Sequence, residues 1–98
     1  MDMRKLCLSN IDFTGAKLYR AQISDAQLSD AVLSSKTDRC VMRYAVLDRV
    51  NAERADFSYA DLAHAELRQA SLTSAVLWKV AAANADFTGA DVAYLPGH

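Results

Sequence analysis

The stretch that decides the fold runs from Ala55 to Leu77 and reads ADFSY-ADLAH-AELRQ-ASLTS-AVL. Every fifth residue from Ala55 to Ala75 is alanine, and a larger apolar residue stands two places after each of these alanines. The larger residues are Phe57, Leu62, Leu67, Leu72 and Leu77. A period of five residues is therefore the first observation that a fold for this chain has to satisfy.

Neither an α-helix nor a flat strand places residues five apart on one side. A helix turns about 100° per residue, so five residues advance the apolar pair by about 140° and leave no single face to bury. In a flat strand successive side chains alternate between faces, so an odd period sends each apolar pair to the opposite side. A chain that bends by about a quarter turn every five residues keeps all of them inside. Such coils would stack at the strand spacing of about 4.8 Å and pair their backbone groups with one another.

The units ADF, ADL and AEL, each followed by two variable residues, resemble the pentapeptide repeat family. The consensus of that family is alanine, then aspartate or asparagine, then leucine, then two variable positions. The resemblance covers nearly the whole chain. It implies an all-β fold, a right-handed quadrilateral parallel β-helix, which we expect to have about four to five coils. We expect one pentapeptide repeat domain over residues 1–98, with a short end segment at 93–98.

The pattern has two runs that are not in register with each other. The central residues of the first run begin near Leu8 and end at Leu33, and those of the second run begin at Met42. The predicted core residues of the two runs are Phe13, Leu18, Ile23, Leu28, Leu33, Leu47, Phe57, Leu62, Leu67, Leu72, Leu77 and Phe87. Leu33 and Met42 are nine residues apart, which we interpret as two pentads with one residue missing. We therefore expect an irregular corner or short loop near 34–39, with a linker between two domains as the alternative.

The composition argues against several classes of protein. The net charge is −1 with 23% charged residues, which is typical neither of a basic nucleic-acid binder nor of an acidic tail. The apolar runs are too short for a membrane span, and residues 1–5 lack the apolar core of a signal peptide. Cys7 is expected to point outward as a free thiol, which suits a reducing compartment. We therefore expect a cytoplasmic bacterial protein, with a secreted bacterial effector as the alternative.

The sequence contains no recognisable pattern for catalysis. His64 is expected to point outward and His98 is terminal, so no Ser-His-Asp set is evident. A glycine-rich phosphate loop and metal-ligand spacings are also missing from the sequence. The repeat tolerates Asp and Glu beside the core leucine, and we expect these carboxylates to be solvated. The prediction is a protein that is not an enzyme and that has no cofactor and no metal.

If alanine and leucine point inward, the other three residues of each pentad point outward. Counted at about twenty residues per coil with a one-residue slip, one face would carry Lys17, Tyr19, Arg20, Arg39, Asp56, Tyr59, Trp78 and Lys79. Aromatic and arginine side chains dominate protein-binding hot spots, so we expect the partner-binding residues to be Tyr19, Arg20, Tyr59, Trp78 and Lys79. The alternatives are side chains that only cover the coil edge, or rings that stack on nucleic-acid bases. We do not expect direct binding of nucleic acid.

The leading interpretation is a non-catalytic, rigid protein-interaction module whose partner the sequence does not name. Some pentapeptide repeat proteins resemble B-form DNA and bind type II topoisomerases, which gives quinolone resistance. The resemblance therefore implies, as the alternative, a DNA-mimicking binder of DNA gyrase or topoisomerase. A net charge of −1 is small for a DNA mimic, because duplex DNA carries about one charge per 1.7 Å.

The C-terminal coil has no helix to cap it in the sequence. Solenoids need polar caps or partners at their open ends, because such an end exposes backbone groups and apolar surface. We therefore expect a homodimer that is joined through the last coil. The residues expected at this dimer end are Val92, Tyr94 and Leu95.

Overall fold

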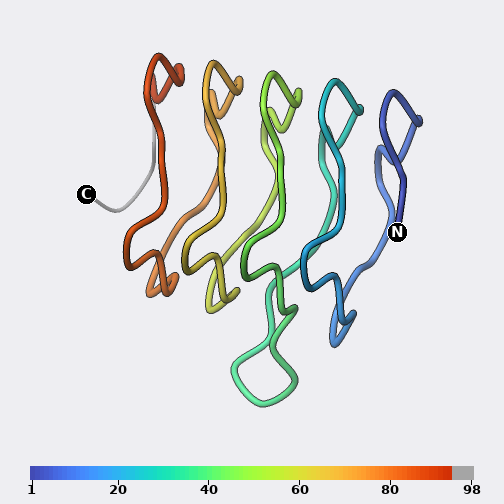
Figure 1. Cartoon of the computed structure of the whole chain (residues 1–98). Coiled ribbons are helices and arrows are strands. Elements are labelled where there is room, and N and C mark those ends of the chain that lie inside the picture. Colours follow the sequence, from blue (N-terminus) through green and yellow to red (C-terminus); the bar gives the residue numbers. More distant parts are fainter. Residues whose placement is uncertain (94–98) are drawn as a thin grey trace.

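The structure, a computed structural model, describes residues 1–93. Within these residues the chain forms no helix and no extended strand, and its regular elements are isolated parallel β-bridges. Figure 1 shows the chain winding through stacked coils, from the blue N-terminal coil to the red coil near residue 93. The pairing is that of a parallel β-helix, the fold class expected from the period of five.

The bridges fall into four columns, in which paired residues are 20 or 24 positions apart. We name each column by its first residue, as the Asp2, Cys7, Asp12 and Lys17 columns. Their members are Asp2, Gln22, Val46, Glu66 and Asp86; Cys7, Gln27, Asn51, Ser71 and Asp91; Asp12, Val32, Asp56 and Val76; and Lys17, Val41, Asp61 and Ala81. After each bridge residue the chain turns a corner, and we name that corner after the column that it follows.

The pentad 61–65 shows how the chain turns. Asp61 forms the bridge and Leu62 is fully buried. The N–H of Ala65 donates to the carbonyl of Leu62 at 3.0 Å, which closes a four-residue turn. His64, the third residue of this turn, has a φ of 61°, as a type II turn requires. Fourteen residues other than glycine adopt such a positive φ at the corners, at a cost of about 1–2 kcal/mol each relative to the right-handed conformation.

Hydrogen bonds between coils hold the corners in this conformation. In the same pentad, the N–H of Asp61 donates to the preceding coil at 3.0 Å, and those of Leu62 and His64 donate to the following coil at 2.7 and 2.8 Å. The remaining N–H, that of Ala63, donates to Oδ1 of Asp61 at 3.1 Å. All five N–H groups of the pentad therefore have partners, which offsets the strained turn.

The bond from Ala63 to Asp61 recurs along the chain and gives the aspartates of the repeat a structural role. The side chains that accept the N–H two residues later are Asp2, Asp12, Asn51, Asp56, Asp61, Asp86 and Asp91. The expectation that these carboxylates are merely solvated is wrong, because they close Asx turns. Hydrogen bonds from Thr14 hold the pKa of Asp12 below its ordinary value, and Thr88 lowers the pKa of Asp86 in the same way.

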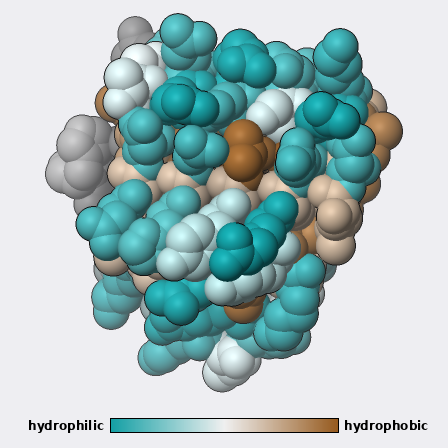
Figure 2. All heavy atoms as spheres, viewed as in Figure 1, coloured by the Kyte–Doolittle hydropathy of each residue, from teal (hydrophilic) through white to brown (hydrophobic). Residues whose placement is uncertain are grey.

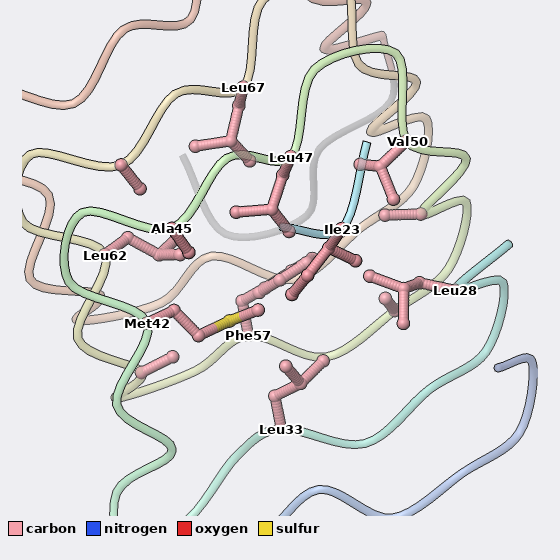
Figure 3. Close-up of a cluster of buried hydrophobic side chains, with 14 of the residues drawn as sticks. Ile23, Leu28, Leu33, Met42, Ala45, Leu47, Val50, Phe57, Leu62 and Leu67 are labelled. Atoms are coloured by element: carbon pink, nitrogen blue, oxygen red, sulfur yellow. The ribbon is translucent and has the colours of Figure 1, made fainter. Parts of the chain in front are cut away.

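The apolar core follows the axis of the coil. In Figure 3, Ile23, Met42, Leu47, Phe57 and Leu62 converge on the interior from different sides. The predicted core residues that are buried are Leu18, Ile23, Leu28, Leu33, Leu47, Phe57, Leu62, Leu67 and Leu72. The remaining three, Phe13, Leu77 and Phe87, belong to the first and last coils and are partly buried against this cluster.

The segment 34–39 differs from the expectation in its length. Bridges on either side of it, such as Lys17 with Val41, join residues 24 apart, whereas the other bridges join residues 20 apart. Four residues are thus inserted at one corner, so the interpretation of one missing residue was wrong. A spacing of nine is either two pentads less one or one pentad plus four, and the polar segment contains no apolar residue to decide between them. Figure 1 shows the insertion as a blue-green loop that extends beyond the coils.

Both ends of the described chain expose apolar side chains. At the N-terminal end Met1, Leu6 and Ile11 are exposed, and at the other end Val92 is exposed. Tyr94 and Leu95, also expected at a dimer end, lie outside the described residues, so the homodimer stays a prediction. Among residues 1–93 there is no helix of a length and hydrophobicity that would cross a membrane.

Candidate functional site: a basic face with two aromatic corners

The four inserted residues change which outward side chains share a corner. Tyr19 and Arg20 lie at the Lys17 corner, whereas Tyr59, Trp78 and Lys79 lie at the Asp12 corner. The expectation that all five share one stack is therefore wrong, because the coil that contains the loop has 24 residues, five more than we counted. The two corners are neighbours along the chain, and the Lys17 column lies between them.

The Lys17 corner carries a ladder of three rings, one from each of three successive coils. The ring centroids of Tyr19 and Tyr44 are 5.8 Å apart with 62° between their planes, an edge-to-face contact. Those of Tyr44 and His64 are 4.7 Å apart and only 4° from parallel, so these rings stack. The guanidinium carbon of Arg20 lies 5.3 Å from the Tyr19 centroid and 4.8 Å from the Tyr44 centroid, within the range of cation–π contacts.

The repeated turn explains this ladder. Arg20, Tyr44 and His64 occupy the same third position of their turns, with φ values of 58°, 61° and 61°. Equivalent positions in paired coils lie about one strand spacing apart, which is also a suitable distance for stacked rings. The sequence reasoning missed Tyr44 and His64 as neighbours of Tyr19. Counting 24 residues instead of 19 across the loop would have found them.

The Asp12 corner carries a second aromatic group. Trp78 is 63% exposed, and the Lys79 ammonium lies 5.9 Å from its ring centroid. The N–H of Tyr59 donates to the carbonyl of Trp78 at 3.0 Å, which places the two residues on adjacent coils. The loop 34–39 belongs to this same corner. Its aspartate lies directly over Gly15, where an added Cβ would collide with the carboxylate.

We call the Lys17 column together with the two corners that border it the basic face. Its charged residues are Lys17, Arg20, Lys36, Arg39, Arg43 and Lys79, against Asp38 and Asp61. The face therefore has six cationic and two acidic side chains, and the rest of the chain has five cationic and ten acidic side chains. A net charge of −1 thus divides into a formal +4 on this face and −5 elsewhere.

Away from the basic face, arginines and carboxylates neutralise one another. The pairs are Arg4 with Asp2 at 2.8 Å, Arg49 with Asp25 at 3.0 Å, Arg54 with Asp30 at 2.9 Å and Arg68 with Asp48 at 2.7 Å. Three of these four pairs join adjacent coils. The hydrogen bonds from the paired guanidinium hold the pKa of Asp25, Asp30 and Asp48 below the ordinary value. Figure 2 shows one side of the molecule, where hydrophilic side chains predominate around a narrow apolar band.

The cations of the basic face are mostly without such partners. Arg43 pairs with Asp61 at 3.1 Å. Among residues 1–93, the other five cations of the face form no ion pair. The face is therefore a surface of uncompensated positive charge next to exposed rings, which is suited to recognition.

The rest of the surface offers little for chemistry. Two open hollows of about 510 and 370 Å³ lie along the Asp2 corner, and the larger is lined by Asp2, Arg4, Lys5, Gln22, Ser24, Asp25 and Arg49. Most of the charged groups in these hollows already pair with one another. In the part of the chain that the structure describes, no group of three or more His, Cys, Asp or Glu side chains could hold a metal ion.

Comparison with known proteins gives the family. The pentapeptide repeat profile matches eight copies in this chain, over residues 2–34, 38–73 and 65–93. The chain therefore belongs to the pentapeptide repeat family, whose members form right-handed β-helices. No curated protein sequence matches the chain significantly.

Several solved structures resemble this one. The pentapeptide repeat protein Rfr23 from the cyanobacterium Cyanothece 51142 has a TM-score of 0.70 at 19% identity, with 92% of this chain and 82% of that chain covered. QnrB1, a plasmid-mediated fluoroquinolone resistance protein, has a TM-score of 0.49 at 14% identity, covering 96% of this chain and 56% of that one. A pentapeptide repeat protein of the Arabidopsis thaliana thylakoid lumen has a TM-score of 0.35 at 26% identity, covering 90% and 62%. The likeness to Rfr23 shows the fold alone.

Proposed function

We propose that this chain is a non-catalytic protein-interaction module, a rod of four to five four-sided coils whose basic face binds another protein. The observation that carries this proposal is the gathering of exposed rings and uncompensated cations on one face. Trp78, Tyr19 and Tyr44 are 63%, 49% and 40% exposed, although aromatic side chains are usually buried. Tyr, Trp and Arg are also the residue types that dominate binding energy in protein interfaces.

The rigid backbone supports the same role. Each corner is fixed by a turn and by hydrogen bonds to neighbouring coils, so the side chains of the basic face are held in place before a partner arrives. Preorganised side chains lose little conformational entropy on binding. The family membership supports a structural module in preference to an enzyme.

The alternative, a DNA mimic that binds gyrase, would require a large uncompensated acidic surface. Here the acidic side chains of the other faces already form ion pairs with arginine or close turns. The resemblance to QnrB1 is too weak to favour that activity. A gyrase supercoiling assay tests it directly, and protection or inhibition at micromolar protein would favour the mimic over our proposal.

The proposal is tested by comparing variants of the basic face with a matched variant elsewhere. We expect the double variant Tyr44→Ala and Trp78→Ala to lose partner proteins that the wild type captures from a bacterial lysate. Thr73→Ala, at a corner that lies off the basic face, should retain them. Circular dichroism of each variant would establish that the coils are intact. Equal capture by all three proteins would contradict the proposal.

Location and assembly are further proposals. We expect the chain to act in the bacterial cytoplasm and to form a homodimer through its C-terminal coil. Sedimentation equilibrium would test the dimer, and a monomer at micromolar concentration would contradict it.

A further inference from the structure

We infer that the basic face recognises an acidic peptide segment of its partner, an inference that rests on the proposed function. The segment would place carboxylates against the uncompensated cations and apolar side chains between the two aromatic corners. Charge, ring geometry and backbone pairing each support this choice.

The charge distribution favours an acidic ligand. The basic face has a formal charge of +4, and five of its six cations form no ion pair among residues 1–93. The opposite faces carry a formal −5 in total, so an acidic segment is repelled there and attracted here. Such an arrangement orients a charged partner during its approach and excludes wrong docking modes.

The ring geometry disfavours nucleic acid, the other acidic class of ligand. A base binds to an exposed aromatic side chain by stacking on the face of its ring. One face of Tyr44 is stacked on His64, and the Arg20 guanidinium lies against the same tyrosine and against Tyr19. What remains accessible is the ring edges, the phenol hydroxyls and the guanidinium edge, which are suitable donors for carboxylates.

The backbone of this face cannot add a strand from the partner. In the pentad 61–65 all five N–H groups already have partners within the chain. Pairing of a peptide with a sheet edge is therefore unavailable in the middle of the face, and recognition depends on side chains. Between the corners, Val41 and Ala81 present small apolar groups beside Lys17, which suits a segment that mixes acidic and small apolar residues.

The test uses a fluorescein-labelled peptide of alternating glutamate and alanine, with fluorescence anisotropy as the readout. We expect the wild-type chain to bind this peptide at about 0.01 M ionic strength and more weakly at about 0.1 M, because the Debye length falls from about 30 to about 10 Å. A peptide of alternating lysine and alanine should not bind. A labelled oligothymidylate serves as the nucleic-acid probe, and it should bind more weakly than the glutamate peptide.

Two lysines provide matched variants. Lys17→Gln, on the basic face, should weaken binding of the glutamate peptide by about two- to fivefold, the effect expected of one exposed ion pair. Lys5→Gln, which makes the same charge change at the Asp2 corner, should leave the affinity unchanged. Neither lysine forms an ion pair among residues 1–93, so both variants should fold.

Several outcomes would overturn the inference. Tighter binding of oligothymidylate than of the glutamate peptide would assign the face to nucleic acid. Equal losses in Lys17→Gln and Lys5→Gln would mean that net charge alone attracts the peptide. If Tyr44 and Trp78 are needed for protein capture but the glutamate peptide does not bind, the proposed function stands and this inference fails.

Discussion

Truncating one core leucine should remove a large part of the stability of this rod. Leu67 is fully buried, and Leu47 and Phe87 occupy the equivalent positions of the two adjacent coils. Leu67→Ala removes three carbon atoms from a site that is enclosed on both sides, so the surroundings cannot collapse easily into the cavity. We therefore expect the upper part of the usual range, a loss of about 3–5 kcal/mol. A loss of about 3 kcal/mol corresponds to a decrease in Tm of about 12–24 °C for a domain of this size.

Urea unfolding followed by far-ultraviolet circular dichroism measures this loss. Gln22→Ala, at an exposed bridge position, is the outward control and should change the unfolding free energy by less than about 0.5 kcal/mol. Leu67→Met keeps the volume and should cost less than about 1.5 kcal/mol, so it provides a folded comparison if the alanine variant fails to fold. Equal losses for Leu67→Ala and Gln22→Ala would refute the assignment of inward and outward positions.

Other predictions concern the ion pairs, the thiols and the loop. The Arg68 guanidinium holds the pKa of Asp48 below its ordinary value, so the pair stabilises the fold above about pH 4 and its contribution is lost as the pH falls through the lowered pKa. Arg68→Ala should thus cost about 1–2 kcal/mol at pH 7, and its difference from wild type in urea unfolding should shrink below about pH 4. Ellman's reagent should titrate the exposed Cys7 in the native protein but Cys40 only in denaturant, because burial shields this thiol and raises its pKa to about 11. Gly15→Ala, at a φ of 74° under the loop carboxylate, should lower stability by about 1–2 kcal/mol, and an unchanged melting temperature would contradict the loop contact.

The arrangement of the core could be predicted because it depends on a local pattern. An alanine and a larger apolar residue at fixed spacing can share one interior only if the chain turns once per pentad. This reasoning placed Leu62 and Leu67 inside, where both are fully buried. It also applied to Val50 and Ala52, a pair whose sizes are exchanged and which is buried as well. Volume and period were sufficient for these positions.

The candidate site could not be predicted because it depends on register across the loop. The segment 34–39 has no inward residue, so its length modulo five did not reveal whether residues were lost or gained. The error separated Tyr19 from Tyr44 and His64, and it joined Tyr19 wrongly to Tyr59. The Asx turns were missed for a different reason. Their signal, an acidic or amide residue before the central leucine, was present but was interpreted as tolerance and not as a hydrogen-bond acceptor.

The extended coil separates contour length from axial repeat. The chain departs at Leu33 and returns at Cys40, both fully buried, and the coils on either side remain paired. Lengthening the excursion further would cost only the entropy of closing a longer loop, which grows slowly with length. This corner is therefore a natural graft point, where a foreign epitope could be displayed without disturbing the layers beneath it.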